Sequence, residues 1–398
     1  MRMRQDSRRG VMGTIASFAA LTGASAAFGG HAKPCWAASA SKARWAPFLA
    51  DPDAVMVTGA LVGERIRVLI DTGSAATLVD RALANRLGLT TAGSLRVRGD
   101  IGSVALSAGD HLSLDISGVK LATSRYLVAD FAPIFGADAP GLILGLDALR
   151  NVILDIDFPG RRLIFRPREG FQADKSAQRL DLTRSARGQL AVPVVIEGHD
   201  PVAAAIDLGS SNPLTLAPSL ADALALLRGR RISSAATGGV DGVSISRTIS
   251  VTSLQVAGAT LRDVPCEVLA KTEPTLFPAK LGLPVLERYR LALDVMGGVL
   301  WLGPAPRLLA LPFKRDLSGL GLAVEPDRLR VVHVARGGPA DLAGWHEGES
   351  VLAVNGAPIG PDYVTVGLAG WRYGPVGTKA VLTLSDGTVR TLVLQRYY

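Results

Sequence analysis

The sequence predicts a mainly β protein that contains an internal duplication. Among its 398 residues are 44 glycines and 23 prolines, and 48% of the residues are hydrophobic while only 5% are aromatic. Many short apolar runs between glycine-containing turns are typical of strands rather than long helices. The run VLIDTGSAATLV at residues 68–79 is echoed by AAIDLGSSNPLTL at residues 204–216. A chain of this length can form two or three domains with a sizeable core.

The first copy of the repeated stretch has the pattern of strand, turn and strand. Residues 68–70 are apolar, Asp71, Thr72 and Gly73 interrupt the run, and the apolar pattern resumes at residue 78. Glycine permits a tight turn, and a carboxylate between two buried strands is costly unless it has a role. An aspartate at such a place is also an ordinary turn or helix cap. The second copy, which carries Asp207, favours a functional role.

The duplication extends beyond the two turns. Gly145, in an LGL triplet, follows Asp71 at nearly the separation at which Gly282, also in an LGL triplet, follows Asp207. Each glycine is then followed at one fixed distance by another aspartate and by a turn into a closing strand (residues 159–165 and 297–302). These recurring aspartates are expected to be structural, and they are Asp157 and Asp294.

Asp-Thr-Gly-Ser between apolar runs, followed by an apolar–apolar–Gly segment, resembles the retropepsin-like aspartic proteases. Two copies in one chain resemble the bilobal pepsin-type arrangement, in which each lobe contributes one catalytic aspartate. The resemblance covers roughly residues 45–305. It implies two duplicated β-barrel lobes, at residues 45–168 and 180–305, with a polar connection between them.

This resemblance implies that Asp71 and Asp207 form the catalytic pair of an aspartic endopeptidase. Two carboxyl groups a few ångströms apart cannot both ionise easily, so they share one proton. The ionised group would take a proton from water and the protonated group would donate one to the leaving nitrogen. The sequence does not assign the two roles. The substrate would be an extended peptide or protein bound between the lobes, with neither cofactor nor metal.

Residues beside the two aspartates have supporting roles in this scheme. The glycines let the two turns approach, and the serines hydrogen-bond and orient the carboxylates: Gly73, Gly209, Ser74 and Ser210. In the family, a Thr or Ser hydroxyl after each aspartate bonds to the opposite lobe. Thr72 fits this pattern and Leu208 does not. The loss of one tether costs about 1 kcal/mol, or up to about 3 kcal/mol if a buried partner is left unpaired.

Two alternatives remain open, and Leu208 motivates the first of them. One is a non-catalytic peptide- or protein-binding module on a decayed protease fold. The other is a homodimer in which two first lobes pair their copies of Asp71.

Both lobes are also expected to contain a glycine-rich hairpin and a short helix. The hairpins, at residues 99–104 and 237–243, are either flaps or ordinary exposed hairpin tips. The helices are expected at residues 80–89 and 218–227.

Residues 316–398 have a different character and resemble a bacterial PDZ domain. The segment contains SGLGL at 318–322, GGPADLAG at 337–344, which predicts a short helix ended by glycine, and EGESVLAVNG at 347–356. The resemblance implies a β/α domain that binds a C-terminal peptide as an added strand. The alternative is a domain that only packs against the lobes. The backbone amides that would hold the peptide carboxylate belong to Gly319, Leu320, Gly321 and Leu322.

Residues 1–40 have the pattern of a secretory signal peptide. SRRGVM at 7–12 resembles a twin-arginine export motif, and a mildly apolar run follows. Small-residue cleavage sites are present at 24–26 and 38–40. An ordinary signal peptide and an uncleaved anchor are the alternatives. We expect a periplasmic or secreted protein with no membrane span after signal removal.

Other functional classes are disfavoured. The net charge is +8, but Lys and Arg are scattered, so nucleic-acid binding is not expected. The five histidines lack metal-ligand spacing. Neither a Gly-x-Ser-x-Gly elbow nor a phosphate-binding glycine loop is present. Of the two cysteines, Cys35 lies in or near the signal, so Cys266 is expected to be a small core residue.

Overall fold

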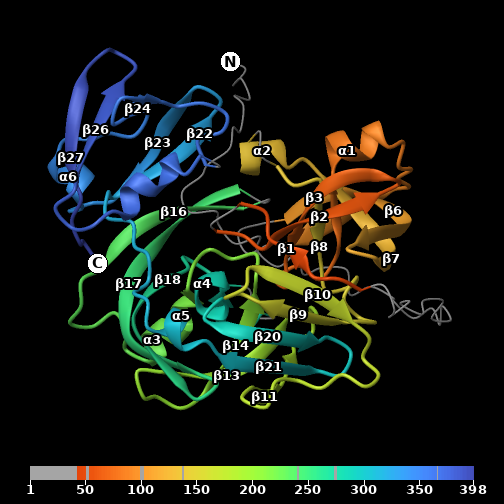
Figure 1. The fold of residues 1–398 in the computed structure, drawn as a ribbon. Helices are drawn as coiled ribbons and strands as arrows, with labels where there is room; N and C mark the ends of the chain where they lie inside the picture. Colours follow the sequence, from red (N-terminus) through yellow and green to blue (C-terminus); the bar gives the residue numbers. More distant parts are fainter. Residues whose placement is uncertain are drawn as a thin grey trace.

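The computed structural model describes residues 43–50, 53–98, 103–136, 139–239, 242–272, 276–364 and 366–398. The expected signal peptide at 1–40 and the tips of both candidate flaps, residues 99–102 and 240–241, lie outside the described residues. The described chain is mainly β, as expected, and its strands form four sheets (Figure 1).

The first lobe is built on a seven-stranded sheet in the order β2-β3-β8-β4-β7-β6-β5. Strand β3 of this sheet carries the apolar residues that precede Asp71, and their side chains are buried. Two short helices, α1 (Arg81–Arg86) and α2 (Ala132–Phe135), accompany the sheet. The strands are β2 (Met56–Leu61), β3 (Glu64–Ile70), β4 (Leu78–Asp80), β5 (Ser94–Arg98), β6 (Ser103–Ile116), β7 (Val119–Ala129) and β8 (Leu142–Leu144).

The second lobe repeats this plan in an eight-stranded sheet with the order β12-β13-β14-β19-β15-β18-β17-β16. Strand β14 pairs in parallel with β19, as β3 does with β8, and Ile206 faces Leu281 as Ile70 faces Leu144. This repeated register confirms the two duplicated lobes. The strands are β12 (Thr183–Arg184), β13 (Leu190–Ile196), β14 (Val202–Asp207), β15 (Leu214–Leu216), β16 (Ser233–Gly239), β17 (Gly242–Val256), β18 (Ala259–Val268) and β19 (Ala279–Gly282).

A third, antiparallel sheet joins the lobes, in the order β1-β10-β9-β20-β21-β11. The pairing of β9 with β20 connects the two halves of the duplication. Asp157 and Asp294 accept the backbone N–H groups of Gly160 and Gly297 at 3.1 and 2.7 Å, so both shape turns, as expected. The strands are β1 (Ala46–Pro47), β9 (Ile153–Asp157), β10 (Arg162–Arg166), β11 (Gln178–Asp181), β20 (Tyr289–Asp294) and β21 (Val299–Pro304).

The helices that follow the two motifs are shorter than expected. Helix α1 begins after Asp80, whose carboxylate accepts the N–H of Leu83 at 3.2 Å, and is followed by Gly88 with φ of 63°. Helix α3 (Pro218–Ala223) is followed by a turn in which Ala225 has φ of 50°. A residue in the left-handed region ends a helix, so both helices stop early. Two further one-turn helices are α4 (Leu283–Leu286) and α5 (Pro306–Leu309).

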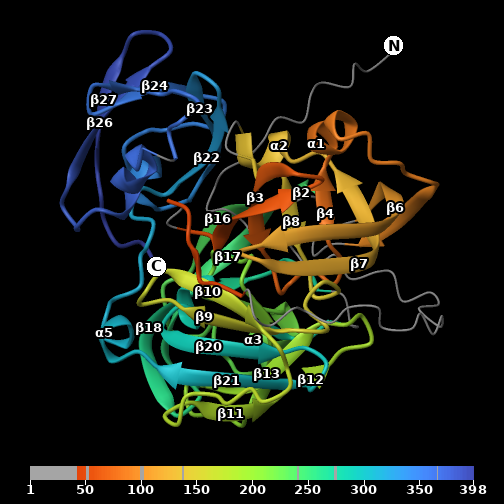
Figure 2. The same cartoon turned by 45° about the vertical axis from the view of Figure 1, so that its right-hand side comes forward.

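The C-terminal residues form a separate sheet in the order β22-β23-β24-β26-β27, with β25 beside β24. It has its own apolar core, which includes Leu329, Trp345 and Leu382. This domain lies next to β16 of the second lobe, and β16 contacts both β22 and β23 (Figure 2). Its elements are β22 (Leu320–Glu325), β23 (Arg328–Val334), α6 (Pro339–Leu342), β24 (Ser350–Val354), β25 (Ala357–Pro358), a 3₁₀ helix η3 (Leu368–Tyr373), β26 (Lys379–Leu384) and β27 (Val389–Val393).

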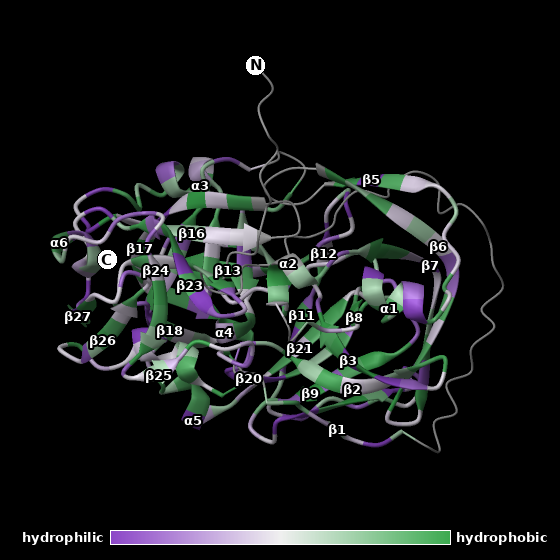
Figure 3. Ribbon diagram, turned by 90° about the horizontal axis from the view of Figure 1, so that it is seen from above, coloured by the Kyte–Doolittle hydropathy of each residue, from purple (hydrophilic) through white to green (hydrophobic). Residues whose placement is uncertain are grey.

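Apolar residues are concentrated in the strands, whereas many connecting loops are hydrophilic (Figure 3). One large core cluster includes residues of both lobes and of the sheet that joins them, such as Ile70, Leu154 and Ile206. Cys266 is buried in this cluster, as expected. Within the described part of the chain, every helix is too short or too polar to cross a membrane.

Candidate active site

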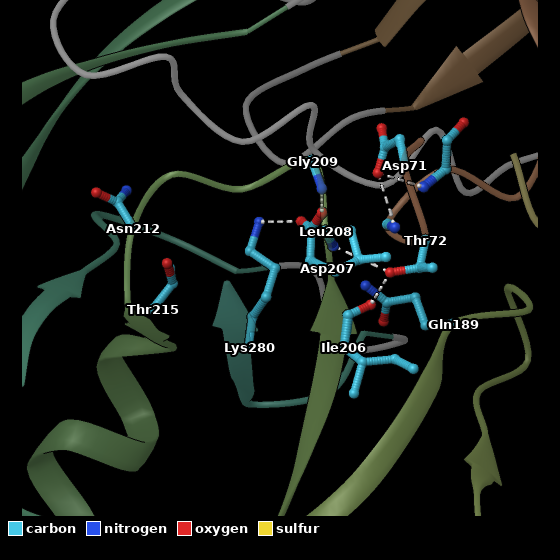
Figure 4. A network of polar contacts seen from close by, with 12 residues as sticks. Asp71, Thr72, Gln189, Ile206, Asp207, Leu208, Gly209, Asn212, Thr215 and Lys280 are labelled. Carbon is cyan, nitrogen blue, oxygen red and sulfur yellow. Dashed lines mark hydrogen bonds and ion pairs between the residues drawn. The ribbon is translucent and has the colours of Figure 1, made fainter. Parts of the chain in front are cut away.

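Asp71 and Asp207 meet at the junction of the two lobes. Asp71 follows β3, Asp207 ends β14, and both are fully buried, with 0% exposure. A Cβ atom built on Gly73 would lie 2.5 Å from Asp207 Cγ, and one built on Gly209 would lie 2.6 Å from Asp71 Cγ. Each carboxyl group therefore rests against the glycine of the opposite lobe. Two residues that are distant in the sequence form one site (Figure 4).

Backbone N–H groups hold both carboxylates in place. Gly73 N donates to Asp71 Oδ1 at 2.8 Å, and Gly209 N donates to Asp207 Oδ1 at 2.9 Å. Ser74 N also donates to Asp71 Oδ1, at 3.2 Å. Fixed N–H donors stabilise the orientation of a carboxylate without a mobile side chain. The two glycines thus permit the close approach and also supply the donors.

The two serines are buried beside the aspartates, but the Ser74 hydroxyl is used elsewhere. Ser74 Oγ donates to the carbonyl oxygen of Ala76 at 2.7 Å. Ser74 therefore orients Asp71 through its backbone and not through its hydroxyl group. The main-chain N–H of Ser210 donates to the carbonyl oxygen of Asp207 at 3.3 Å and closes the second turn.

Thr72 ties the lobes together. Its Oγ1 accepts the N–H of Leu208 at 3.0 Å and donates to the carbonyl oxygen of Ile206 at 3.1 Å. The reciprocal position holds Leu208, which is 1% exposed and packs in the main core cluster. One hydroxyl therefore makes both cross-lobe bonds on its side, while the opposite residue contributes apolar packing. Although Leu208 has no hydroxyl group, its backbone N–H is still bound to the first lobe through Thr72.

Removal of the Thr72 hydroxyl is expected to destabilise the junction. In Thr72→Val the buried N–H of Leu208 and the buried carbonyl group of Ile206 both lose the Thr72 hydroxyl as their hydrogen-bond partner. Each buried group left unsatisfied costs about 1–3 kcal/mol in the free energy of unfolding. Denaturant titration of the wild type, Thr72→Val and Thr72→Ser measures this cost. The serine variant keeps the hydroxyl and is expected to retain most of the stability, whereas equal losses in both variants would contradict the tether.

Lys280 is a member of the site that the sequence analysis did not identify. Its Nζ lies 3.3 Å from Asp207 Oδ2, and its side chain is 9% exposed. It is in β19 and pairs with Ala205, whereas the first lobe has Ile143 paired with Leu69 at the same place. The available signal was AKLG at residues 279–282, where the first copy has LILG. A lysine at an apolar position of the repeat marked the difference.

Lys280 belongs to a row of polar residues that crosses three neighbouring strands of the second lobe. Thr215 in β15 pairs with Lys280 on one side and with Glu267 in β18 on the other. We call these three residues the polar row. Glu267 is buried and accepts hydrogen bonds from Asn212 Nδ2 at 2.6 Å and from Thr237 Oγ1 at 2.5 Å. Its carboxylate thus orders the loop after Asp207 and the part of β16 that lies near the hairpin turn.

The first lobe has an apolar row at the corresponding positions. Leu78 in β4 pairs with Ile143 on one side and with Leu127 in β7 on the other. All three belong to one apolar core cluster. The two lobes therefore share a backbone plan and differ in the chemistry beneath the site. Only the second aspartate has a cation in contact with it among the described residues.

The surroundings of Asp71 favour its protonated form. Burial raises the pKa of Asp71 well above its ordinary value, and the neighbouring charge of Asp207 raises it further. The hydrogen bond from Gly73 N–H and the charge of Lys280 act in the opposite direction. Burial disfavours a charged carboxylate because the interior solvates it poorly. At neutral pH the site is therefore expected to hold one proton between two carboxyl groups.

The residues expected to bind a peptide carboxylate belong to the C-terminal domain and lie at its boundary with the second lobe. Gly319, which has φ of 73°, precedes β22, and the other three begin that strand. Leu320 N donates to Ser318 Oγ at 3.1 Å. A cavity of about 210 Å³ lies between this loop and the second lobe and is lined by Gly319, Leu320, Gly321, Thr237, Glu267 and His333, among others. Among the described residues, no group of His, Cys, Asp or Glu is placed to hold a metal ion.

Two segments of the chain match the "Aspartyl protease" family model: residues 57–148 and residues 192–285. Each match lies in one lobe and includes its aspartate. The fold is similar to the crystal structure of Basic 7S globulin from soybean, with 12% identity and a TM-score of 0.42, over 69% of this chain and 100% of that chain. A search of curated proteins gave no match. Residues 316–398 lie outside both family matches.

Proposed function

We propose that this protein is an exported aspartic endopeptidase that hydrolyses peptide bonds with Asp71 and Asp207. The observation that carries the proposal is the mutual packing of the two carboxyl groups, each against the glycine of the opposite lobe. The family match in both lobes supports it. Their contact within one chain also favours an intramolecular pair over pairing between the first lobes of two chains.

The chemistry follows from two carboxyl groups that share one proton. An ionised carboxylate takes a proton from a water molecule as the water oxygen attacks the scissile carbonyl carbon. The other carboxyl group, still protonated, donates its proton to the leaving nitrogen as the C–N bond breaks. The pair again holds one proton, now the one taken from water, and transfer of this proton between the two carboxyl groups restores the starting state. The reaction therefore consumes only water and the peptide.

A peptide library tests the proposal directly. The chain without its first 40 residues is incubated with a mixed library from pH 3 to 8, and new peptide ends are identified by mass spectrometry. A variant with both aspartates replaced by Asn serves as the blank. Cleavage by the wild type and not by the blank supports the proposal. Absence of cleavage by folded protein at every pH would contradict it.

The C-terminal domain is proposed to be PDZ-like and to recruit or gate substrate. Its loop at 318–322 and the β16 hairpin face the same cavity, and Ser234 Oγ lies 2.8 Å from His333 Nε2 across the boundary. A ligand at the loop would therefore also contact a hairpin of the second lobe. The library is prepared with free and with amidated C-termini for this reason. Preferential cleavage or binding of peptides with free C-termini supports recruitment. Equal cleavage and binding of both forms would indicate a domain that only packs against the lobes.

Export is proposed from residues 1–40, with the periplasm or the exterior as the destination. The twin-arginine-like SRRGVM at 7–12 and the apolar run that follows support it. N-terminal sequencing of protein recovered from cell fractions would identify the cleaved end. A full-length chain retained in the cytoplasm would contradict export.

A second candidate function is a non-catalytic peptide- or protein-binding module. Leu208 favours it, because the family pattern has a hydroxyl at that position and the chain has none. Such a module would bind library peptides in the lobes without cleaving them. Peptides that are retained intact by the wild type and released by the doubly substituted variant would support this function.

A further inference from the structure

In the described part of the chain, the second carboxylate of the site has a cationic partner and the first has none. Asp207 Oδ1 accepts the N–H of Gly209, and Asp207 Oδ2 lies 3.3 Å from the ammonium of Lys280. Figure 4 shows the lysine side chain extended from β19 toward the aspartate. Lys280 is almost completely buried, and an ammonium group is rarely buried without an ionised partner. The contact is therefore an ion pair inside the site.

The lysine breaks the symmetry of two lobes that are otherwise alike at this place. Ile143 occupies the corresponding position of the first lobe and packs in an apolar cluster. An apolar residue would fill this position at no desolvation cost, whereas a buried ion pair seldom stabilises a fold more than apolar packing does. The stability of the fold therefore does not explain a lysine at this position. The effect of its charge on the carboxylate of Asp207 does explain it.

Few charged groups of the described residues act at the site. The charges that shift the pKa of Asp71 come from Asp207 and Lys280. On the strands next to β19, β15 contributes the neutral Thr215, and beyond it β18 contributes Glu267. The oxygens of Glu267 accept hydrogen bonds from Asn212 and Thr237. Among the described residues, Lys280 is the cation in contact with the pair, and its ion pair is with Asp207.

We infer that Lys280 is a positioning residue that assigns the two roles: it holds Asp207 as the carboxylate that takes the proton from water, and it leaves Asp71 as the acid that donates a proton to the leaving nitrogen. The inference rests on the proposed peptidase function and deepens it. With one proton on the pair, the three groups carry no net charge, and this state is the least costly in a buried site. The raised pKa of Asp71 agrees with this assignment.

The direction of the pH effect follows from the sign of the charge. A cation beside the pair favours loss of protons, so Lys280 lowers the pH at which the doubly protonated, inactive form gives way to the active form. It also lowers, by less, the pH at which Asp71 loses its proton, because Asp71 is not in direct contact with the ammonium. An opposite charge at this range typically moves a carboxyl pKa by about 1–3 units. Removal of the cation moves both limbs of the activity profile to higher pH, and the acid limb moves more.

A pair of methionine variants tests this effect. Lys280→Met removes the cation, and Ile143→Met places the same side chain at the corresponding position of the first lobe. The pH dependence of kcat/KM is measured for both and for the wild type. We expect the acid limb of Lys280→Met to rise by about 1–3 pH units, with the limbs of Ile143→Met unmoved. Lys280→Arg keeps the charge and is expected to keep the limbs of the wild type, whatever its rate. Unmoved limbs in Lys280→Met would overturn the inference.

A second readout does not depend on cleavage. The carboxyl carbons of ¹³C-labelled aspartate are titrated by NMR in the same chain, and Asp71→Asn and Asp207→Asn assign the two signals. The Asp207 signal is expected to titrate at lower pH in the wild type than in Lys280→Met. Lys280→Gln provides a second neutral side chain if the methionine variant does not fold. Equal titration in the wild type and the neutral variants would overturn the inference even if peptides are cleaved. A shifted titration without any cleavage would uphold the charge assignment and count against the peptidase function alone.

Discussion

Asp71→Asn and Asp207→Asn are each expected to lower kcat for peptide hydrolysis by about 10³-fold or more, because each carboxyl group transfers a proton in the reaction. Asparagine has nearly the shape of aspartate, and its oxygen can accept the N–H bonds that Gly73 and Gly209 donate. The fold should therefore survive while proton transfer is lost. Initial rates on the best library peptide, measured at each pH, give the effect.

The two single variants also separate the arrangements that the sequence left open. Asp222→Asn changes an exposed aspartate in α3 and serves as the matched control, with an unchanged rate expected. Loss of activity in both site variants supports the pair within one chain. Loss with Asp71→Asn alone would point to first lobes paired between two chains. Full activity in both would remove the two aspartates from the reaction.

Gly73→Ala and Gly209→Ala are expected to lower both stability and activity. The new Cβ atom would lie 2.5 Å from Asp207 Cγ in the first case and 2.6 Å from Asp71 Cγ in the second, so a carboxyl group must move. Overpacking of a buried site costs about 1–3 kcal/mol of unfolding free energy. A displacement of about 1 Å can also lower the rate by about 10²-fold. Thermal unfolding and the rate of peptide cleavage measure the two effects.

Gly303→Ala is the matched control for the glycine variants. The nearest atoms to a Cβ at Gly303 are 3.6 Å away, which is ordinary contact. This variant is expected to keep the stability and the rate of the wild type. Wild-type behaviour of Gly73→Ala would contradict the close packing of carboxyl group and glycine on which the site depends.

The fold and the two aspartates were predictable because their signals are local and repeated. Asp71 and Asp207 each follow a run of apolar residues, and the LGL triplets recur at nearly equal separations. Pairing of β3 with β8 and of β14 with β19 follows from that repetition. The turn roles of Asp157 and Asp294 were predictable for the same reason.

Other features depend on contacts that the sequence does not specify. Lys280 approaches Asp207 because β14 and β19 are neighbours in a particular register, and the same lysine in an isolated strand carries no such meaning. The Ser74 hydroxyl was expected to bond the carboxylate, but the fold of the loop places the carbonyl oxygen of Ala76 at 2.7 Å from it. The early ends of α1 and α3 depend on left-handed residues just after them.

The sheet that joins the lobes has a mechanical consequence. Strand β9 pairs with β20 along its whole length, from Ile153 opposite Asp294 to Asp157 opposite Arg290. Main-chain hydrogen bonds and a common apolar core therefore join the two lobes, in addition to the covalent connection between them. Neither lobe can unfold without exposing the buried face of the other, so we expect the two lobes to unfold in a single cooperative transition. A change in the separation of the lobes would then require the six-stranded sheet that joins them to bend.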